Sequence, residues 1–220
     1  MFEGGRMDPR EEAELVFNRV VDYCENHSGD TPLDCMLSHN PEDYSTFASL
    51  YLNDEELEEL EAEAIEDPKA YDDEAEKEYA KLWNEWLAEE IAYDLGSLVI
   101  EDLARYIANK DELDNASKVE RLKAYAEVLH EFADAIKRAL QEKKPLSSAN
   151  LYKWFKRLAE FAPSNQTDYI KDADFYLDFY DMYDVDQLQT LDLLLQYVNR
   201  TLRKIENEYL PELGALTNKI

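Results

Sequence analysis

Apolar side chains recur three and four residues apart along most of the chain, the spacing that gathers them on one face of an α-helix. Several of these segments begin with a small polar residue followed by proline, a pair that suits the first turn of a helix. The pattern predicts helices over about residues 8–27, 40–51, 53–65, 68–107, 117–142, 151–161, 168–186 and 188–209, with a loop at 28–34 and Gly96 as a candidate kink.

The residue composition supports a helical protein. The chain holds only 5 Gly and 7 Pro among 220 residues, which favours helices over the turn-rich strands of an all-β protein. A hydrophobic content of 45% is sufficient for a sizeable core. We therefore predict an all-α fold, an irregular multi-helix bundle of roughly seven to eight helices. We expect a single helical domain over residues 1–220, with a subdivision into 1–66 and 67–220 as the alternative.

The last predicted helix carries an unbroken alternation of three- and four-residue steps that matches a heptad seam over about three repeats. Its members are Leu188, Leu191, Leu195, Val198, Leu202, Ile205 and Tyr209. Such a seam either packs inside an antiparallel bundle or joins two copies of a chain. We expect the intramolecular packing, and a homodimer through residues 188–209 is the alternative.

The net charge of the chain adds a second theme. There are 51 Asp and Glu against 23 Lys and Arg, a net charge of −28. Residues 54–94 alone hold 18 carboxylates against three lysines, and residues 168–186 hold seven aspartates against one lysine. Like charges three and four residues apart on a helix repel one another, and a high net charge opposes the compact state. This crowding therefore serves a partner or solubility, and not stability.

The acidity also excludes some partners. It argues against direct binding of DNA or RNA and against binding to anionic membranes, both of which would repel the chain. The first fifteen residues carry charges throughout and lack the apolar core of a secretory signal, and no window approaches a membrane span. Aromatic residues within the acidic stretches are typical of a folded protein and not of a disordered acidic tail. We expect a soluble, cytoplasmic protein.

The density of charge in residues 54–94 suggests a function. As one helix, this segment would carry a net negative charge every ~4 Å, near the ~3.4 Å per charge along one strand of duplex DNA. The pattern resembles the functional class of nucleic-acid mimics, several of which are inhibitors encoded by phages and mobile elements. We predict a helical binding protein that masks a basic nucleic-acid-binding protein or nuclease, such as a host defence nuclease. The candidate contact residues are Glu55, Glu58, Glu59, Glu61, Glu63, Asp72, Asp73, Glu74, Glu76, Asp174, Asp178 and Asp181.

Two other functions are consistent with the sequence. A structural or oligomeric scaffold would use the same acidity only for solubility, because a charge run is most often a solvated helix face. An all-α nucleotide pyrophosphohydrolase would hold Mg²⁺ between carboxylates of facing helices, for which Glu85, Glu89, Glu90, Asp94, Glu101 and Asp102 are available. Such pairs arise by chance in so acidic a chain, and no nucleophile elbow or phosphate-binding glycine loop is present. We predict that the protein is not an enzyme and needs no cofactor.

A cluster of potential metal ligands stands near the N-terminus. Both cysteines and two of the three histidines fall within sixteen residues, as Cys24-x2-His27-x7-Cys35-x3-His39. The plainest interpretation is that the cysteines are small buried apolar residues. The alternative is a tetrahedral structural Zn²⁺ site formed by the two pairs. A disulfide between Cys24 and Cys35 ranks below zinc, because the compartment is expected to be reducing.

Overall fold

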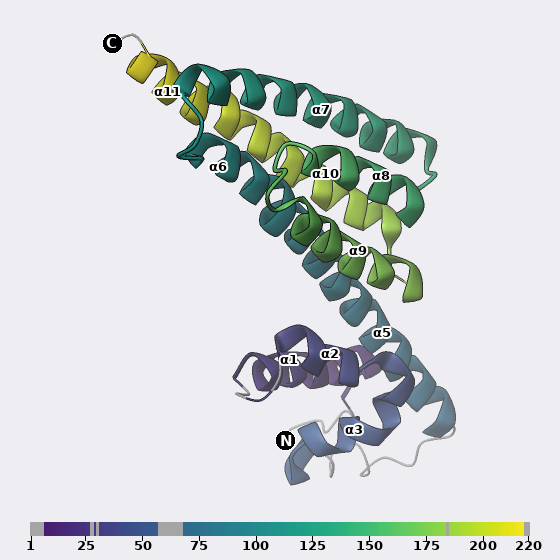
Figure 1. Ribbon diagram of the computed structural model, residues 1–220. Helices are drawn as coiled ribbons and strands as arrows, with labels where there is room; N and C mark the ends of the chain where they lie inside the picture. Colours follow the sequence, from purple (N-terminus) through teal and green to yellow (C-terminus); the bar gives the residue numbers. More distant parts are fainter. Residues whose placement is uncertain (1–6, 27–28, 30, 57–67, 184, 218–220) are drawn as a thin grey trace. The chain divides into compact units, whose positions relative to one another are not determined.

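A computed structural model describes residues 7–26, 29, 31–56, 68–183 and 185–217, and every regular element among them is a helix (Figure 1). The prediction of an all-α multi-helix bundle is confirmed. No helix of the described ranges combines the length and the apolar character that a membrane span requires. The chain divides into two compact units, Met1–Trp86 and Leu87–Ile220, which we call unit 1 and unit 2. The boundary between them falls inside the helix Pro68–Tyr93. The alternative subdivision predicted from the sequence, into 1–66 and 67–220, places this boundary twenty residues earlier.

Unit 1 is built from one helix of 18 residues, short helical segments and the first part of a long helix. Its elements are α1 (Pro9–Asn26), α2 (Pro32–Ser38), the 3-10 helix η1 (Pro41–Asp43), α3 (Tyr44–Tyr51) and the start of α5 (Pro68–Tyr93). α1 ends within one residue of the predicted position, but α2 begins inside the predicted loop 28–34 and continues to Ser38. Its start is signalled by Thr31, whose side chain accepts a hydrogen bond from the N–H of Asp34, and by Pro32 in the first turn.

Aromatic side chains dominate the core of unit 1. Tyr79 of α5 is fully buried, and its ring meets those of Phe17, Tyr44 and Phe47 at centroid distances of 5.1 to 5.9 Å. One turn further along α5, the buried Trp83 donates its indole N–H to the carbonyl oxygen of Met36 at 3.0 Å. Such aromatic pairs contribute beyond the area that they bury. The long side chains of α5 therefore connect it to α1, α2 and α3.

The predicted long helix is present as one run with an irregular segment in it. α5 is followed directly by a π-helical segment, η2 (Asp94–Glu101), and then by α6 (Asp102–Asn109). The irregular segment contains Gly96, the candidate kink. A Cβ atom at Gly96 would lie 2.4 Å from Cβ of Tyr197, closer than two such atoms approach. Glycine is therefore needed for helix α10 (Gln187–Lys204) to pack against η2.

Unit 2 is the larger of the two units. It begins with the end of α5, followed by η2 and α6. The remaining elements are α7 (Asn115–Glu142), α8 (Ser148–Ala159), α9 (Gln166–Met182), α10, the π-helical η3 (Ile205–Tyr209) and α11 (Leu210–Thr217). α7 runs beside α10 and α11, and α8 packs along α9 (Figure 1). The centre of unit 2 includes Leu129, Phe132, Phe155 and Val198, none of them more than 1% exposed. Close packing of apolar helix faces holds this unit together.

The N-terminus of α7 differs slightly from its predicted position. The helix begins two residues before residue 117, because Asp114 and not Ser117 caps it. Oδ1 of Asp114 accepts a hydrogen bond from the N–H of Ser117 at 2.7 Å. The C-terminus lies at Glu142 as predicted, where Lys143 takes a left-handed conformation with φ of 52°.

Candidate functional site

One exposed face of α9 carries three of the predicted contact residues. Asp174, Asp178 and Asp181 follow one another at steps of four and three, so they share one face of the helix, and all three are exposed. The neighbouring face of α9 is buried, and α9 packs along α8. That buried face consists of Tyr169, Ala173, Leu177 and Tyr180. Its packing holds the three aspartates in a fixed row.

The aspartates of α9 are not neutralised by cations within the described part of the chain. There, no Lys or Arg nitrogen lies within 4.0 Å of a carboxylate oxygen of Asp168, Asp172, Asp174, Asp178 or Asp181. The adjacent helix α8 differs, because its Arg157 pairs with Glu131 of α7 at 2.6 Å and lies over the ring of Trp154. α9 therefore presents uncompensated negative charge.

A pocket of about 180 Å³ opens between α8 and α9, and we call it the unit 2 pocket. Asp174 and Asp178 line it on the α9 side together with Leu177. Ser148, Ala149 and Tyr152 line it on the α8 side. Ser148 also donates a hydrogen bond to Asp181, which connects the pocket to the rest of the row. The pocket offers two carboxylates and two hydroxyl groups to a single cationic group.

Most of the described part of the acidic segment 54–94 lies on α5. Asp72, Asp73 and Glu74 are exposed and Glu76 is half-buried. The nearby Tyr71, Ala75 and Tyr79 are buried. Glu55 is exposed as well. The other predicted contact residues, Glu58, Glu59, Glu61 and Glu63, lie outside the described residues. The charge array expected over residues 54–94 can therefore be followed only at residues 54–56 and from Pro68 onward.

Asp72 and Glu76 line a second pocket of about 180 Å³, which lies between α1, α3 and α5 and which we call the unit 1 pocket. Glu12 of α1 also lines it and is only 5% exposed. The two carboxylate oxygens of Glu12 accept hydrogen bonds from the hydroxyls of Tyr44 at 2.9 Å and Tyr71 at 2.6 Å. Burial, and then the charge of Glu12, raises the pKa of Tyr44, so its hydroxyl keeps the proton that it donates.

Two carboxylates of unit 2 resist ionisation. Asp94 is 6% exposed, and burial raises its pKa, while a hydrogen bond from Tyr176 opposes the rise and the charge of Asp172 adds to it. Burial also raises the pKa of Glu90, with the charges of Asp94 and Glu89 acting in the same direction. These two groups therefore take up protons at a higher pH than unperturbed carboxyl groups.

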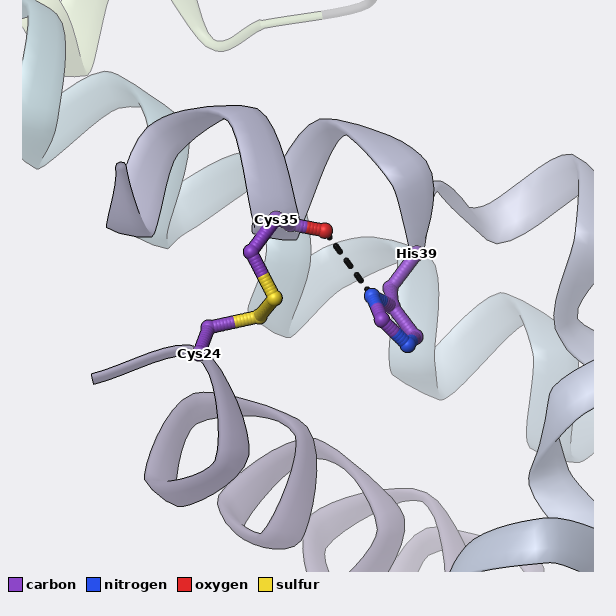
Figure 2. Close-up of side chains that lie close together, drawn as sticks. All are labelled: Cys24, Cys35 and His39. Carbon is purple, nitrogen blue, oxygen red and sulfur yellow. Dashed lines mark hydrogen bonds between the residues drawn. A yellow bond between two sulfur atoms is a disulfide. The ribbon is translucent and has the colours of Figure 1, made fainter. Parts of the chain in front are cut away.

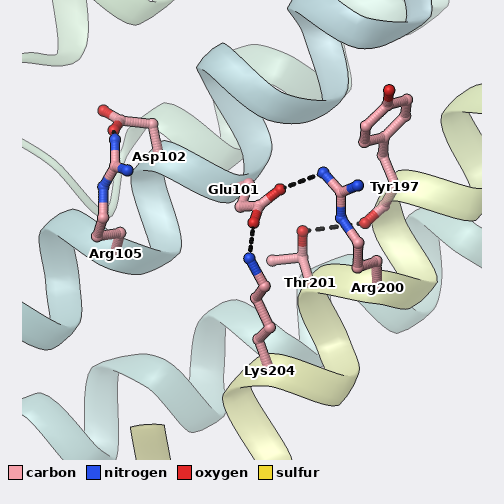
Figure 3. A network of polar contacts seen from close by, with 7 residues as sticks. All are labelled: Glu101, Asp102, Arg105, Tyr197, Arg200, Thr201 and Lys204. Atoms are coloured by element: carbon pink, nitrogen blue, oxygen red, sulfur yellow. Dashed lines mark hydrogen bonds and ion pairs between the residues drawn. The ribbon is translucent and has the colours of Figure 1, made fainter. Parts of the chain in front are cut away.

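Two of the carboxylates considered for Mg²⁺ are occupied by cations (Figure 3). Glu101 accepts hydrogen bonds from Lys204 and from Arg200, the latter at 2.5 Å, and Asp102 accepts one from Arg105. Burial by itself would raise the pKa of Glu101, but the bonds from Lys204 and Arg200 outweigh it and lower the pKa. Over the described ranges, no group of three carboxylates comes close enough together to hold a metal ion.

Cys24 at the end of α1 and Cys35 in α2 form a disulfide bond (Figure 2). Both cysteines are buried, as the plainest interpretation of the sequence expects, but they are also covalently joined. From the sequence, this disulfide ranks below a zinc site because a reducing compartment is expected. The fold, however, brings the two sulfur atoms together. His39 lies beside them, with one ring nitrogen and both sulfur atoms within 4.8 Å of one another. His27, the fourth predicted zinc ligand, lies outside the described residues.

The heptad seam of the last helix is used inside unit 2. Leu191, Val198, Leu202 and Ile205 are at most 5% exposed, and α10 packs against α7 and η2. This is the intramolecular packing expected for the seam. The homodimer through residues 188–209 stays a prediction.

The sequence alone does not identify Glu12 and Ser148, which line the two pockets together with the predicted acidic residues. Glu12 is joined to Tyr44 and Tyr71 across 32 and 59 positions of the chain, and Ser148 is joined to Asp181 across 33. One local signal was available for Glu12, because it lies on the same helix face as the buried Val16. A carboxylate on an apolar face indicates a buried polar contact.

Known proteins provide no further guide to the function. No protein-family model, no curated protein and no solved structure matches the chain. The function must therefore be argued from the geometry and chemistry of the surfaces described above.

Proposed function

We propose that the protein binds a basic protein of the kind that holds DNA or RNA, and that its carboxylates occupy positions where phosphates would lie. One observation, common to both units, carries the proposal. In each unit, two predicted contact residues four positions apart line a pocket that also offers serine and tyrosine hydroxyls. The pairs are Asp72 with Glu76 in unit 1 and Asp174 with Asp178 in unit 2.

Each pocket suits the end of one lysine or arginine side chain. Carboxylates and hydroxyl oxygens are the acceptors that an ammonium or guanidinium group requires, and charge-assisted hydrogen bonds are roughly twice as strong as neutral ones. The volume of about 180 Å³ is small. Sites for drug-sized ligands measure roughly 300–1,000 Å³. The pockets therefore favour one long side chain of a partner over a cofactor.

The row of aspartates on α9 supplies the phosphate-like part of the surface. Residues four apart on a helix have Cβ atoms roughly 5–6 Å apart, near the spacing of successive phosphates. Lysine and arginine side chains that contact a nucleic-acid backbone recognise charge and position without reading the bases. A rigid row of carboxylates at this spacing competes for the same contacts, and its uncompensated field attracts the partner before contact.

The two alternatives have less support. A scaffold needs a free apolar surface, but the best candidate, the seam on α10, is largely buried within unit 2. A Mg²⁺-dependent hydrolase needs convergent carboxylates, but Glu101 and Asp102 are paired with cations. Neither alternative accounts for the acidic pockets.

A competition experiment tests the proposal. A basic, sequence-nonspecific DNA-binding protein, such as a bacterial histone-like protein, is bound to a fluorescein-labelled duplex, and the full chain is added while fluorescence anisotropy follows release of the duplex. We expect release at about 50 mM salt, with an apparent affinity that falls by more than about tenfold by about 200 mM salt, because many ion pairs form together.

A matched pair of variants separates the surface from the overall charge. The triple variant Asp174→Asn, Asp178→Asn, Asp181→Asn neutralises α9, and the control Glu120→Gln, Glu127→Gln, Glu142→Gln removes the same charge from exposed positions of α7. We expect the α9 variant to compete about tenfold less well and the control to change less than about threefold. Equal effects of both variants, or failure of the wild-type chain to release the duplex, would contradict the proposal.

A further inference from the structure

The Cys24–Cys35 disulfide and His39 form a compact group that the proposed binding function does not use. Cys24 is 1% and Cys35 is 6% exposed, so both sulfur atoms lie inside unit 1. One ring nitrogen of His39 and the two sulfur atoms lie within 4.8 Å of one another. In the described ranges this is the one group of potential metal ligands that comes so close together.

We propose that these three residues bind a zinc ion when the disulfide is reduced, so that the same side chains join α1 to α2 in both redox states. Thiolate sulfur and imidazole nitrogen are the ligands that Zn²⁺ prefers in structural sites. Tetrahedral coordination with Zn–S bonds of ~2.3 Å sets the two sulfur atoms about 3.8 Å apart. Once the bond between them is broken, only small side-chain movements are needed to reach that arrangement.

The position of His39 favours coordination through Nδ1. Nδ1–H donates a hydrogen bond to the carbonyl oxygen of Cys35 at 2.8 Å (Figure 2). The other ring nitrogen, Nε2, then accepts one from the hydroxyl of Tyr51 at 2.6 Å. When Nδ1 binds the metal, it gives up the bond to the carbonyl oxygen, and Nε2–H donates to Tyr51. A hydrogen bond at the second ring nitrogen is the usual support of a metal-bound histidine. The ring also contacts Phe47 at a centroid distance of 5.3 Å, which limits its rotation.

The chemistry balances with one external reductant. A dithiol transfers two electrons and two protons to the Cys24–Cys35 bond and becomes a disulfide itself, leaving two thiols on the chain. Zinc then displaces both thiol protons to solvent. Two thiolates and a neutral imidazole cancel the charge of Zn²⁺, so no net charge is buried. Three protein ligands leave a fourth position for water or another ligand.

Cobalt binding to the full chain tests the inference, because Co²⁺ occupies zinc sites and its thiolate bonds absorb strongly in the near ultraviolet. The chain is reduced with a phosphine, and an unreduced sample serves as the reference. We expect one Co²⁺ per reduced chain with thiolate-to-metal absorption, none in the unreduced chain, and displacement of the signal by Zn²⁺. A reduced chain that shows no thiolate-to-metal absorption overturns the proposal.

Variants establish the role of the histidine. His39→Asn should lower the affinity for Co²⁺ by more than about tenfold, since even the loss of an outer-shell partner costs roughly that much. His130→Asn removes a histidine of unit 2 that is 59% exposed and should leave the affinity unchanged. His39→Cys restores a third ligand and should recover binding with stronger thiolate absorption, which also shows that substitution at this position permits folding. Equal affinities of His39→Asn and the wild type overturn the proposal.

Discussion

The two units hold similar acidic pockets by different means. The unit 1 pocket lies between α1, α3 and α5, in a unit that includes two short helices, α2 with 7 residues and α3 with 8. The support of unit 1 includes a disulfide and a buried carboxylate shared by two tyrosines. The unit 2 pocket lies between helices of a bundle whose longest member, α7, has 28 residues. Short helices bury less apolar surface, so cross-links and polar contacts carry more of the stability. Both cysteines belong to unit 1, so we expect reduction without bound metal to weaken unit 1 and not unit 2.

Reduction of the disulfide should produce the largest difference between the units. Cys24 and Cys35 are separated by 11 positions, and opening a loop of that size costs about 3 kcal/mol of stability in the chain-entropy model. With a metal chelator present, we expect reduction to lower the hydrogen-exchange protection of amides in α1 and α2 and to leave α7 and α10 unchanged. The double variant Cys24→Ser, Cys35→Ser should not respond to the reductant. An equal loss of protection in α7 would mean that the disulfide supports both units.

Removal of one tyrosine hydroxyl from each unit should have a smaller effect than reduction. We expect the free energy of unfolding to fall more for the unit 1 variant than for the unit 2 variant. Tyr44→Phe leaves an oxygen of the buried Glu12 carboxylate without its donor, whereas Tyr125→Phe removes a bond to the neutral carbonyl oxygen of Ile100. Hydrogen bonds to charged groups contribute about 1.5–3 kcal/mol and neutral ones about 0.5–1.5 kcal/mol. Denaturant unfolding of the two variants measures the difference. A larger loss of stability for Tyr125→Phe would show that the hydrogen bond from Tyr44 to Glu12 does not contribute as much as expected.

Acidification should give the smallest contrast, with opposite signs in the two units. A hydrogen bond from Arg19 lowers the pKa of Glu56 in unit 1, so its contribution is lost as the pH falls through the folded-state pKa. Burial raises the pKa of Asp94 in unit 2, so the folded state binds the proton first and gains stability as the pH falls toward the unperturbed 3.8. We expect Asp94→Asn to be at least as stable as the wild type at neutral pH.

Thermal unfolding from neutral pH down to about pH 4 checks this last contrast. The wild type should gain stability relative to Asp94→Asn on acidification, because the variant has no carboxyl group to protonate at that position. Parallel curves for the two proteins would show that Asp94 titrates as an ordinary aspartate.

Local patterns were sufficient for most helices and for the exposed acidic faces. α1 and the start of α5 follow from proline and apolar spacing, and the outward face of Asp174, Asp178 and Asp181 follows from steps of four and three along α9. α2 was missed although Thr31 and Pro32 signal its start, because a segment of seven residues has too few apolar positions to show a helical period. The cap of α7 was placed late because Asp114 and Ser117 both qualify as capping residues.

The sequence by itself determined that the protein is helical and that most of the described acidic contact residues lie on exposed helix faces, since both properties depend on neighbours a few positions away. Only the tertiary structure decided that Cys24 joins Cys35, that Glu12 is shared by Tyr44 and Tyr71, and that the acidic pairs line pockets. These contacts are made between different helices. The period of a single helix shows which of its faces is buried, but it carries no information on the element that covers that face.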